Sequence, residues 1–359
     1  MDVIPTLTCL ICPNGCGLKI SRENDTYQIR GNRCIKGVDF ARNQLKKTGI
    51  SGNIRSAKAF LHYDEEHISQ ILSLWDLPLN SLEENRFIQG SPERSLYRTS
   101  LLSGSQRLIL EQIEPEQASK HEKTALRLDR LKKVGLPVTP FLRGKNGRVV
   151  QEAENRFWQL TPFSQGIALN RNNYWQDAWR GEGLGRFLCR LYEREQPDSR
   201  EPSFNLIDFI NSLVEKISLN HRDLLLPLNP ILQRLEETVF PVYKDIPTVF
   251  GHGDPHPLNI IWGEGKIETI IDWEFCGTKP ILYDASLVMG CVGSESPEAF
   301  DSPFNRAFYG EIKKAIPPLW LGLLPDFILA QRFAWLNEWL RHEDETMVLQ
   351  EIRYMEMLL

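Results

Sequence analysis

The sequence predicts a mixed α+β protein with a small β-rich lobe, a larger helical lobe after it, and a cysteine-containing module in front of both. Residues 80–164 hold several runs of alternating apolar and polar residues, which is the period of strands. Residues 165–359 instead repeat apolar residues at helical spacing. The first 34 residues contain four cysteines. A sheet-forming region followed by a helical region favours two lobes with a cleft between them.

The first 48 residues are predicted to form a module of their own. The runs "GLKIS" and "TYQIR" flank the turn-forming "RENDT", which favours a hairpin between the third and fourth cysteines. The stretch "VDFARNQLKK" predicts a short helix, and "TGISGNIRS" predicts a Gly/Ser linker. We expect residues 49–79 to contain this linker and a further helix before the β-rich lobe begins at residue 80.

The β-rich lobe is expected to be a small sheet with one helix against it. The stretch "SLYRTSLLSGSQRLILEQI" predicts two strands around Ser103 and Gly104. A helix over "ASKHEKTALRLDRLKKVG" should end at Gly135, and two more strands, "VTPFL" and "RFWQL", should follow on either side of "GKNG". In the helical lobe, "GEGLGRFLCRLYE" and the C-terminal 33 residues predict amphipathic helices.

The composition narrows the classes of partner. The chain has 359 residues, 42% of them hydrophobic and 25% charged, and its net charge is −5. Such a chain lacks the overall basic character that binds nucleic acid or anionic lipid, so we expect a small-molecule substrate. The most apolar stretch, "IPPLWLGLLPDFILA", is broken by prolines, so we expect a cytoplasmic protein with no membrane span. Seven cysteines, an odd number, favour a metal site in a reducing compartment over disulfides.

A candidate catalytic site follows from the stretch "HGDPHPLNIIW". If Gly265 and Lys266 form the turn of the next hairpin, antiparallel pairing places Asn259 opposite Asp272. An amide oxygen and a carboxylate would then converge, and both are oxygen ligands suited to Mg²⁺. Asp254, on the loop before this hairpin, would face the same place as a general base. The structural alternative is that an aspartate before a proline only shapes a turn.

These residues also carry a resemblance. "HGDPHPLN" together with "IIDWE" resembles the catalytic and metal-binding segments of the aminoglycoside phosphotransferase and choline kinase family, relatives of the protein kinases. The resemblance covers about residues 80–358 and implies a bilobal protein-kinase-like fold. It implies that Asp254 is the catalytic base, that Asn259 and Asp272 hold Mg²⁺, and that His252 braces the loop. Asp284 matches a later family aspartate, although a helix N-cap explains it equally well.

The nucleotide side of the site rests on fewer residues. The family's phosphate loop would correspond to "QGSPERSLYRT", where Gly90 permits close backbone approach and Ser91 offers a hydroxyl. The adenine is expected against "WQLTPF", where the lobes join. We give no catalytic role to His256, which stands between two prolines.

A charge mismatch stands out on the strand after the phosphate loop. The family places a lysine or arginine there to hold phosphates, whereas this sequence offers Glu111, which would repel them. Glu122, on the following helix, matches the acidic partner of the missing base, and the structural alternative is a solvated helix residue. Arg107, on the same strand face as Glu111, or Arg98, on the preceding strand, would supply the positive charge instead.

Four N-terminal cysteines predict a soft-metal site. Cys9, Cys12, Cys16 and Cys34 follow the spacing C-x₂-C-x₃-C-x₁₇-C, and four thiolates can hold Zn²⁺ or an iron-sulfur cluster. The segment resembles a small uncharacterised cysteine-motif domain and the N-terminal [4Fe-4S] segment of molybdopterin oxidoreductases. By that resemblance we favour a [4Fe-4S] cluster over zinc, with a redox partner protein as a possible consequence.

Together these patterns predict an ATP- and Mg²⁺-dependent phosphotransferase acting on a hydroxyl of a small molecule. Two alternatives stay open, a pseudokinase or redox-sensing binding protein, and an electron-transfer accessory that uses the cysteine cluster. The acceptor would bind the helical lobe. There Trp320, Arg332, Trp335 and Trp339 are candidates, although the spacing of the last three is also that of ordinary core packing, which we favour.

Overall fold

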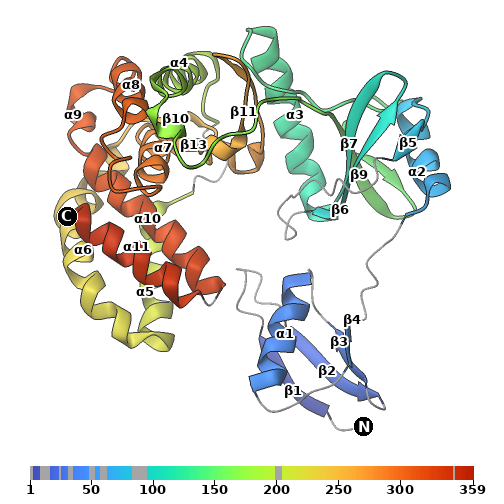
Figure 1. Ribbon diagram of the computed structural model, residues 1–359, viewed down its shortest axis with the longest axis horizontal. Coiled ribbons are helices and arrows are strands. Elements are labelled where there is room, and N and C mark those ends of the chain that lie inside the picture. Colours follow the sequence, from blue (N-terminus) through green and yellow to red (C-terminus); the bar gives the residue numbers. More distant parts are fainter. Residues whose placement is uncertain are drawn as a thin grey trace. The chain divides into compact units, whose positions relative to one another are not determined.

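The fold is mixed α+β, with sheets in the N-terminal part and helices in the C-terminal part, as predicted (Figure 1). The computed structural model divides into two compact units, one of residues 1–123 and 141–163 and the other of residues 124–140 and 164–359. It describes residues 3–8, 17–23, 26–30, 35–47, 53–56, 63–82, 95–198, 204–342 and 344–359.

The N-terminal module is a four-stranded sheet with one helix, drawn in blue in Figure 1. Its elements are β1 (Val3–Thr8), β2 (Gly17–Glu23), β3 (Thr26–Arg30), α1 (Ile35–Lys47) and β4 (Asn53–Ser56). The β2–β3 hairpin and the helix confirm the predictions made for this region. Buried apolar residues of both layers form its core: Leu18, Ile20, Tyr27, Ile29, Val38, Phe40, Ala41 and Leu45.

The predicted linker "TGISGNIRS" is wrong in part, because it contains strand β4. This strand pairs in parallel with β3, and Ile54 lies opposite Tyr27. Parallel strands need a crossover connection, and α1 supplies it. The module therefore extends beyond the expected boundary at residue 48. The predicted ligands and loop residues Cys9, Cys12, Cys16, Cys34, Gly90 and Ser91 lie outside the described residues.

A five-stranded sheet forms the β-rich lobe, in the order β5-β6-β7-β9-β8. All four pairings are antiparallel. The strands are β5 (Ser81–Leu82), β6 (Ser95–Ser103), β7 (Gln106–Ile113), β8 (Gln151–Ala153) and β9 (Arg156–Pro162). The hairpin predicted around Gly104 is confirmed, and this glycine has the positive φ of 59° that a tight turn requires.

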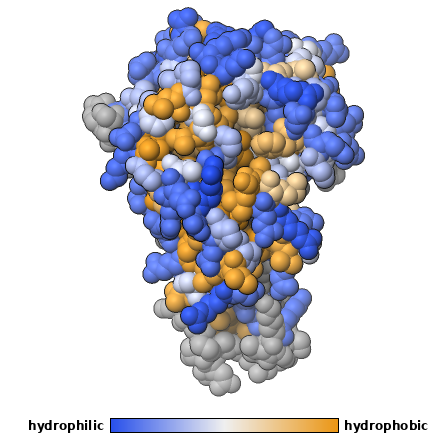
Figure 2. Space-filling view, turned by 90° about the vertical axis from the view of Figure 1, so that its left-hand side faces the viewer, coloured by the Kyte–Doolittle hydropathy of each residue, from blue (hydrophilic) through white to orange (hydrophobic). Residues whose placement is uncertain are grey.

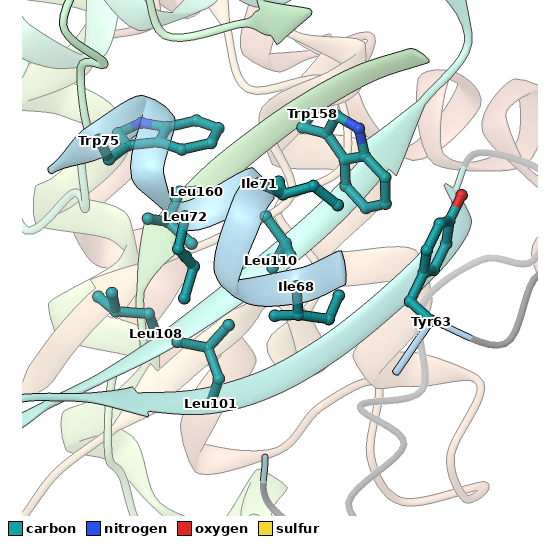
Figure 3. Packing of buried hydrophobic residues seen from close by; sticks show 10 residues of the cluster. All are labelled: Tyr63, Ile68, Ile71, Leu72, Trp75, Leu101, Leu108, Leu110, Trp158 and Leu160. Carbon is teal, nitrogen blue, oxygen red and sulfur yellow. The ribbon is translucent and has the colours of Figure 1, made fainter. Parts of the chain in front are cut away.

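One face of this sheet is apolar and is covered by α2 (Glu65–Leu72) and the short 3-10 helix η1 (Ser73–Trp75). Because strand side chains alternate between faces, β7 buries Leu108 and Leu110 on this side. Figure 3 shows helix and strand side chains interleaving in the cluster of Tyr63, Ile68, Ile71, Leu72, Trp75, Leu101, Leu108, Leu110, Trp158 and Leu160.

The strand predicted over "VTPFL" is wrong. Residues 138–142 form only an isolated bridge, between Val138 and Ile270, and the strands that pair with β9 are β7 and β8. Pro137 and Pro140 remove two backbone donors from this stretch, which is therefore unsuited to a central strand. Strand β8 instead turns directly into β9 through Glu154 and Asn155, whose φ values of 53° and 59° match a type I′ hairpin turn.

The predicted helix after β7 is confirmed as α3 (Ala118–Lys133), and Gly135 follows it with a φ of 76°. Its buried residues Ala125, Leu128 and Leu131 lie on one face. Gly104 follows the end of β6 and Gly135 follows the end of α3, as the sequence predicted.

The helical unit is built from α4 (Ala178–Arg194), α5 (Leu206–Asn220), α6 (Leu225–Thr238), α7 (Tyr283–Gly293), α8 (Pro303–Ile312), α9 (Pro318–Leu321), α10 (Leu324–Arg341) and α11 (Glu345–Met357). The amphipathic helices predicted for α4 and for the C-terminus, α10 and α11, are confirmed. Helices α4 and α8 approach closely at Gly181, where a Cβ atom would lie 2.0 Å from the Phe304 carbonyl oxygen.

The surface of the molecule is mixed in polarity. Figure 2 shows one face on which hydrophilic residues surround several apolar patches. Exposed apolar side chains of the helical unit include Leu219, Leu226, Leu319 and Met357. Scattered apolar residues of this kind are usual on soluble surfaces. Among the described residues, no helix is both long and apolar enough to cross a membrane.

Candidate active site

Two short antiparallel strand pairs hold the candidate site within the helical unit. Strand β10 (Thr248–Gly251) pairs with β13 (Gly277–Pro280), and β11 (Ile260–Trp262) pairs with β12 (Ile267–Ile270). The segment 252–259 leads from β10 to β11, and the segment 271–276 leads from β12 to β13. The pairing therefore fixes both ends of both segments. After the roles predicted for their residues, we name residues 252–259 the catalytic loop and residues 271–276 the metal loop.

The predicted hairpin between these loops forms, but its register is wrong by one residue. Ile260 lies opposite Ile270, and the backbone of Asn259 accepts a hydrogen bond from the Ile271 amide at 3.0 Å. The turn is centred on Glu264 and Gly265, and the pairing shifts between Ile261 and Trp262. With this turn, regular pairing would place Asn259 opposite Ile270, and the extra residue on β12 moves its partner to Ile271, one residue short of the predicted Asp272.

Asp254 and Asn259 contact each other directly in the catalytic loop. The side-chain amide of Asn259 donates to the Asp254 backbone oxygen at 2.9 Å and to its carboxylate at 3.2 Å. Asn259 is buried, whereas the Asp254 side chain is 20% exposed. The Asp254 carboxylate is therefore oriented by a buried donor and remains accessible from solvent.

His252 connects the catalytic loop to the metal loop. Its Nδ1 accepts the Asp254 backbone N–H at 3.2 Å, so Nε2 carries the proton and donates to the Ile271 carbonyl oxygen at 3.0 Å. The ring is fully buried and packs against Trp273 with centroids 4.5 Å apart. Burial lowers the pKa of His252 to about 3, so the imidazole is neutral at physiological pH.

The carboxylate of Asp284 fixes the backbone at the start of the catalytic loop. Its carboxylate accepts the backbone N–H groups of His252 at 2.7 Å and Gly253 at 2.9 Å. Burial raises the pKa of Asp284 to about 6, opposed by these two hydrogen bonds and by Lys279. The alternative of a helix N-cap is wrong, because Leu282 precedes α7 and the Asp284 side chain bonds to another segment.

Asp272 stands in a strained backbone conformation at the start of the metal loop. Its φ of 62° and ψ of 60° lie in the left-handed region, which few residues other than glycine adopt. Such strain often marks a functional position. Asp272 and Asn259 offer one carboxylate and one amide, a donor set that suits Mg²⁺. Within the described part of the chain, no three histidine, cysteine, aspartate or glutamate side chains group as metal ligands.

Glu111 belongs to a polar row on the other face of the β-rich sheet. It lies opposite Arg98 on β6 and opposite Gln159 on β9, whose side-chain amide donates to it at 2.6 Å. His121 on α3 lies nearby: burial lowers its pKa, and the Glu111 charge opposes that shift. Glu111 therefore acts within the sheet as a hydrogen-bond acceptor.

Glu122 has a basic partner that the sequence did not indicate. Its carboxylate accepts the Val150 backbone N–H at 2.9 Å and lies 3.4 Å from the Arg148 Nε. The stretch containing Arg148 reads only as a turn. The guanidinium of Arg107, one of the predicted replacement bases, stacks 4.3 Å above the Phe163 ring.

The candidate acceptor residues of α10 divide into two kinds. Arg332 is buried and forms a two-pronged ion pair with Glu351 at 2.6 and 2.7 Å, which is a structural role. Trp335 and Trp339 are only partly buried, and the Trp335 ring lies 6.4 Å from that of His256. His256 Nε2 is in turn 3.7 Å from the Asp254 carboxylate, so this histidine lies nearer to the site than the sequence indicated.

The buried neutral state of His252 predicts a pH-dependent stability. In the folded protein its pKa is about 3, below the value near 6.5 of an exposed histidine, so the unfolded chain binds more protons between these values. The stabilisation is present above the upper value and is lost on acidification. We expect the difference in unfolding free energy between wild type and His252→Gln to shrink by about 2 kcal/mol from about pH 7 to about pH 5.

Denaturant titrations at the two pH values measure this difference. Asp284 titrates in both proteins, so its opposite contribution cancels in the comparison. The exposed His221, replaced in the same way, provides the matched control for the substitution itself. An unchanged difference for His252→Gln would mean that His252 titrates as an exposed histidine does.

Comparison with known proteins identifies the family. The model of the "Phosphotransferase enzyme family" matches residues 92–350. A homoserine kinase of Gluconobacter oxydans is 23% identical over 211 residues, which are 54% of this chain and 64% of that protein. The chain thus spans less than two thirds of this relative's length.

Solved structures agree on the fold. Spectinomycin phosphotransferase, in complex with ADP and spectinomycin, superposes with a TM-score of 0.58 at 14% identity, covering 83% of this chain and 95% of that one. A putative aminoglycoside phosphotransferase from Ralstonia eutropha gives the same TM-score at 14% identity, covering 82% and 99%. These likenesses confirm the bilobal kinase-like fold, and the match over residues 92–350 shows that the chain belongs to the phosphotransferase enzyme family.

Proposed function

We propose that the protein transfers the γ-phosphoryl group of ATP to a hydroxyl group of a small molecule. The observation that carries this proposal is the pairing of Asp254 with Asn259 in a loop tied through His252 to the segment of Asp272. Phosphoryl transfer depends mainly on positioning and on neutralising charge, and it needs a carboxylate that orients the attacking hydroxyl.

Asp254 is the residue proposed to act on the acceptor hydroxyl. The amide of Asn259 and the backbone contact to His252 hold its carboxylate and its main chain at once. A general base must lie within hydrogen-bond reach of the proton it accepts, and the partial exposure of Asp254 leaves room for an acceptor.

Asn259 and Asp272 are the residues proposed to hold Mg²⁺. Their oxygen donors suit this ion, which commonly takes few protein ligands and completes its shell with phosphates and water. When bound, the ion would neutralise phosphate charge. The left-handed backbone at Asp272 supports a functional role, since such strain is otherwise unfavourable.

The acceptor is proposed only as a class. The relatives named above act on homoserine and on spectinomycin, as their names state, and their resemblance to this chain is distant. We therefore propose a small hydroxyl compound as substrate and ATP as phosphoryl donor.

Glu111 favours a second candidate function. A carboxylate held by Gln159 stands on the strand where a phosphate-binding base was expected. On this alternative the protein binds a nucleotide or metabolite without turnover and relays a signal, with the cysteine module as a redox sensor.

Substitution of Asp254 tests the catalytic proposal. We expect Asp254→Asn to lower ADP release with a panel of hydroxyl acceptors by at least about a hundredfold while nucleotide binding persists, since only proton acceptance is lost. Asp272→Asn should remove the Mg²⁺-dependent part of nucleotide affinity, measured by calorimetry. The control Asp223→Asn changes an exposed aspartate on another segment and should alter neither quantity.

The same measurements separate the two candidate functions. ADP release that survives in Asp254→Asn would contradict its role as base. Mg²⁺-dependent nucleotide binding without ADP release for any acceptor would instead favour the binding protein.

Arg98 and Arg107 are proposed as replacement phosphate anchors. Arg98 lies opposite Glu111. Arg107 precedes Glu111 on β7 and lies on the same strand face as Glu111. If one of them holds the phosphates, Arg98→Ala or Arg107→Ala should weaken ATP binding about tenfold or more, as loss of a charge-assisted contact predicts. Lys120→Ala removes an exposed cation from the same unit as a control. Unchanged affinity in both arginine variants would exclude this pair.

We propose further that Cys9, Cys12, Cys16 and Cys34 hold a [4Fe-4S] cluster, with Zn²⁺ as the alternative metal. Protein purified without oxygen should be brown and carry about four iron atoms per chain. Cys12→Ser should lower the iron content, whereas Cys189→Ser, a change at a cysteine of α4, should not. Colourless protein containing zinc would replace the cluster with a zinc site, and absence of both metals would remove the site.

A further inference from the structure

A hollow of about 700 Å³ lies in the helical unit, between the C-terminal half of α3 and the end of α4. Its volume is that of a small-molecule pocket. The charged residues that line it are Arg127, Arg130, Lys133, Arg194, Glu195 and Asp198. We name it the α3–α4 hollow.

The lining of this hollow carries an excess of positive charge. Four cations face two carboxylates. Glu195 is buried and already engaged by Arg130, which bonds it through both Nε and Nη2. In the described part of the chain, neither Lys133 nor Arg194 forms an ion pair with an acidic residue. A bound anion would therefore gain two cationic donors that form no ion pair within the described part of the chain.

Two anchors hold the walls in place. Arg127 is buried, and its guanidinium lies 4.4 Å above the ring of Phe250. On the other wall, the backbone oxygen of Asp198 accepts a hydrogen bond from the Thr278 hydroxyl at 3.1 Å. Because both contacts are to β10 and β13, the basic residues are presented by a scaffold that is already ordered.

From these features we propose that the α3–α4 hollow is a binding site for a phosphorylated small molecule. Guanidinium groups match phosphate oxygens with paired donors, and lysine adds a point charge. Val134 and Pro197 also line the hollow and offer apolar contact to the carbon skeleton of such a ligand. A small molecule fits better than nucleic acid, because the volume of the hollow is about 700 Å³ and the whole chain carries a net charge of −5.

The hollow is separate from the catalytic loop but adjoins its support. Phe250, which contacts Arg127, is followed directly by Gly251 and the catalytic loop. Its ring also stacks with that of Trp273, the residue after Asp272, at a centroid distance of 6.5 Å. The proposed site does not depend on the proposed kinase function, since its ligand can be measured whether or not ATP is turned over.

Calorimetric titration of the full chain tests the site. Glycerol phosphate, inorganic phosphate and citrate serve as probes, in the presence of saturating ADP and Mg²⁺ so that a nucleotide site is occupied. We expect glycerol phosphate to bind, and Lys133→Ala and Arg194→Ala each to weaken it about tenfold. Both residues are exposed, so folding should not depend on them. Lys132→Ala changes the neighbouring exposed lysine, which does not line the hollow, and should leave binding unchanged.

Four outcomes would overturn the proposal. Glycerol phosphate that does not bind, or that binds equally well to wild type and to the Lys133→Ala, Arg194→Ala double variant, would exclude the α3–α4 hollow. Inorganic phosphate or citrate binding as tightly as the ester would indicate a site for anions in general. Tighter binding of a poly-glutamate peptide than of the ester would indicate a macromolecular partner.

Discussion

The buried carboxylate of Asp284 is the constraint on which the candidate site depends. Removing a carboxylate from water is costly unless donors replace the lost hydration, and here the amides of His252 and Gly253 do so. Those two hydrogen bonds fix the backbone that enters the catalytic loop. The His252 ring then forms hydrogen bonds with the Asp254 backbone N–H and with the Ile271 carbonyl oxygen. The positions of both loops therefore depend on the contacts of the buried Asp284 carboxylate.

The backbone conformations of Gly253 and Asp272 also constrain the two loops. Gly253 has a φ of 85°, and a Cβ atom there would lie 2.2 Å from the Phe275 carbonyl oxygen, so only glycine fits between the loops. Asp272 also has a positive φ, of 62°, although it carries a side chain. The close approach at Gly253 and the strain at Asp272 therefore lie in the two loops that His252 joins by hydrogen bonds. Strain of this kind persists only where the surrounding contacts over-determine it.

Local patterns predicted the elements well, and tertiary contacts account for what they missed. Alternation and turn residues located the β6–β7 hairpin, because both signals lie within a few residues. The register of the β11–β12 hairpin was wrong because the turn lies one residue earlier than predicted, and the extra residue on β12 offsets only part of that displacement. The hydrogen bonds of Asp284 and the ion pair between Arg148 and Glu122 each join segments that are distant in the sequence. Patterns within one segment do not predict such contacts.

Glu111 and Glu122 show that a charge considered in the sequence alone can be assigned the wrong role. Glu111 repels phosphate if it faces one, yet its hydrogen bond to Gln159 and its position opposite Arg98 give it a role in the sheet itself. Glu122 forms an ion pair with Arg148, which lies on a turn. A basic residue on β7 is therefore not needed to pair with Glu122. A carboxylate on β7 is therefore compatible with phosphate binding, provided that the anchoring charge comes from another strand position. We therefore expect nucleotide affinity to depend on where an arginine is placed. The presence of Glu111 alone does not determine that affinity.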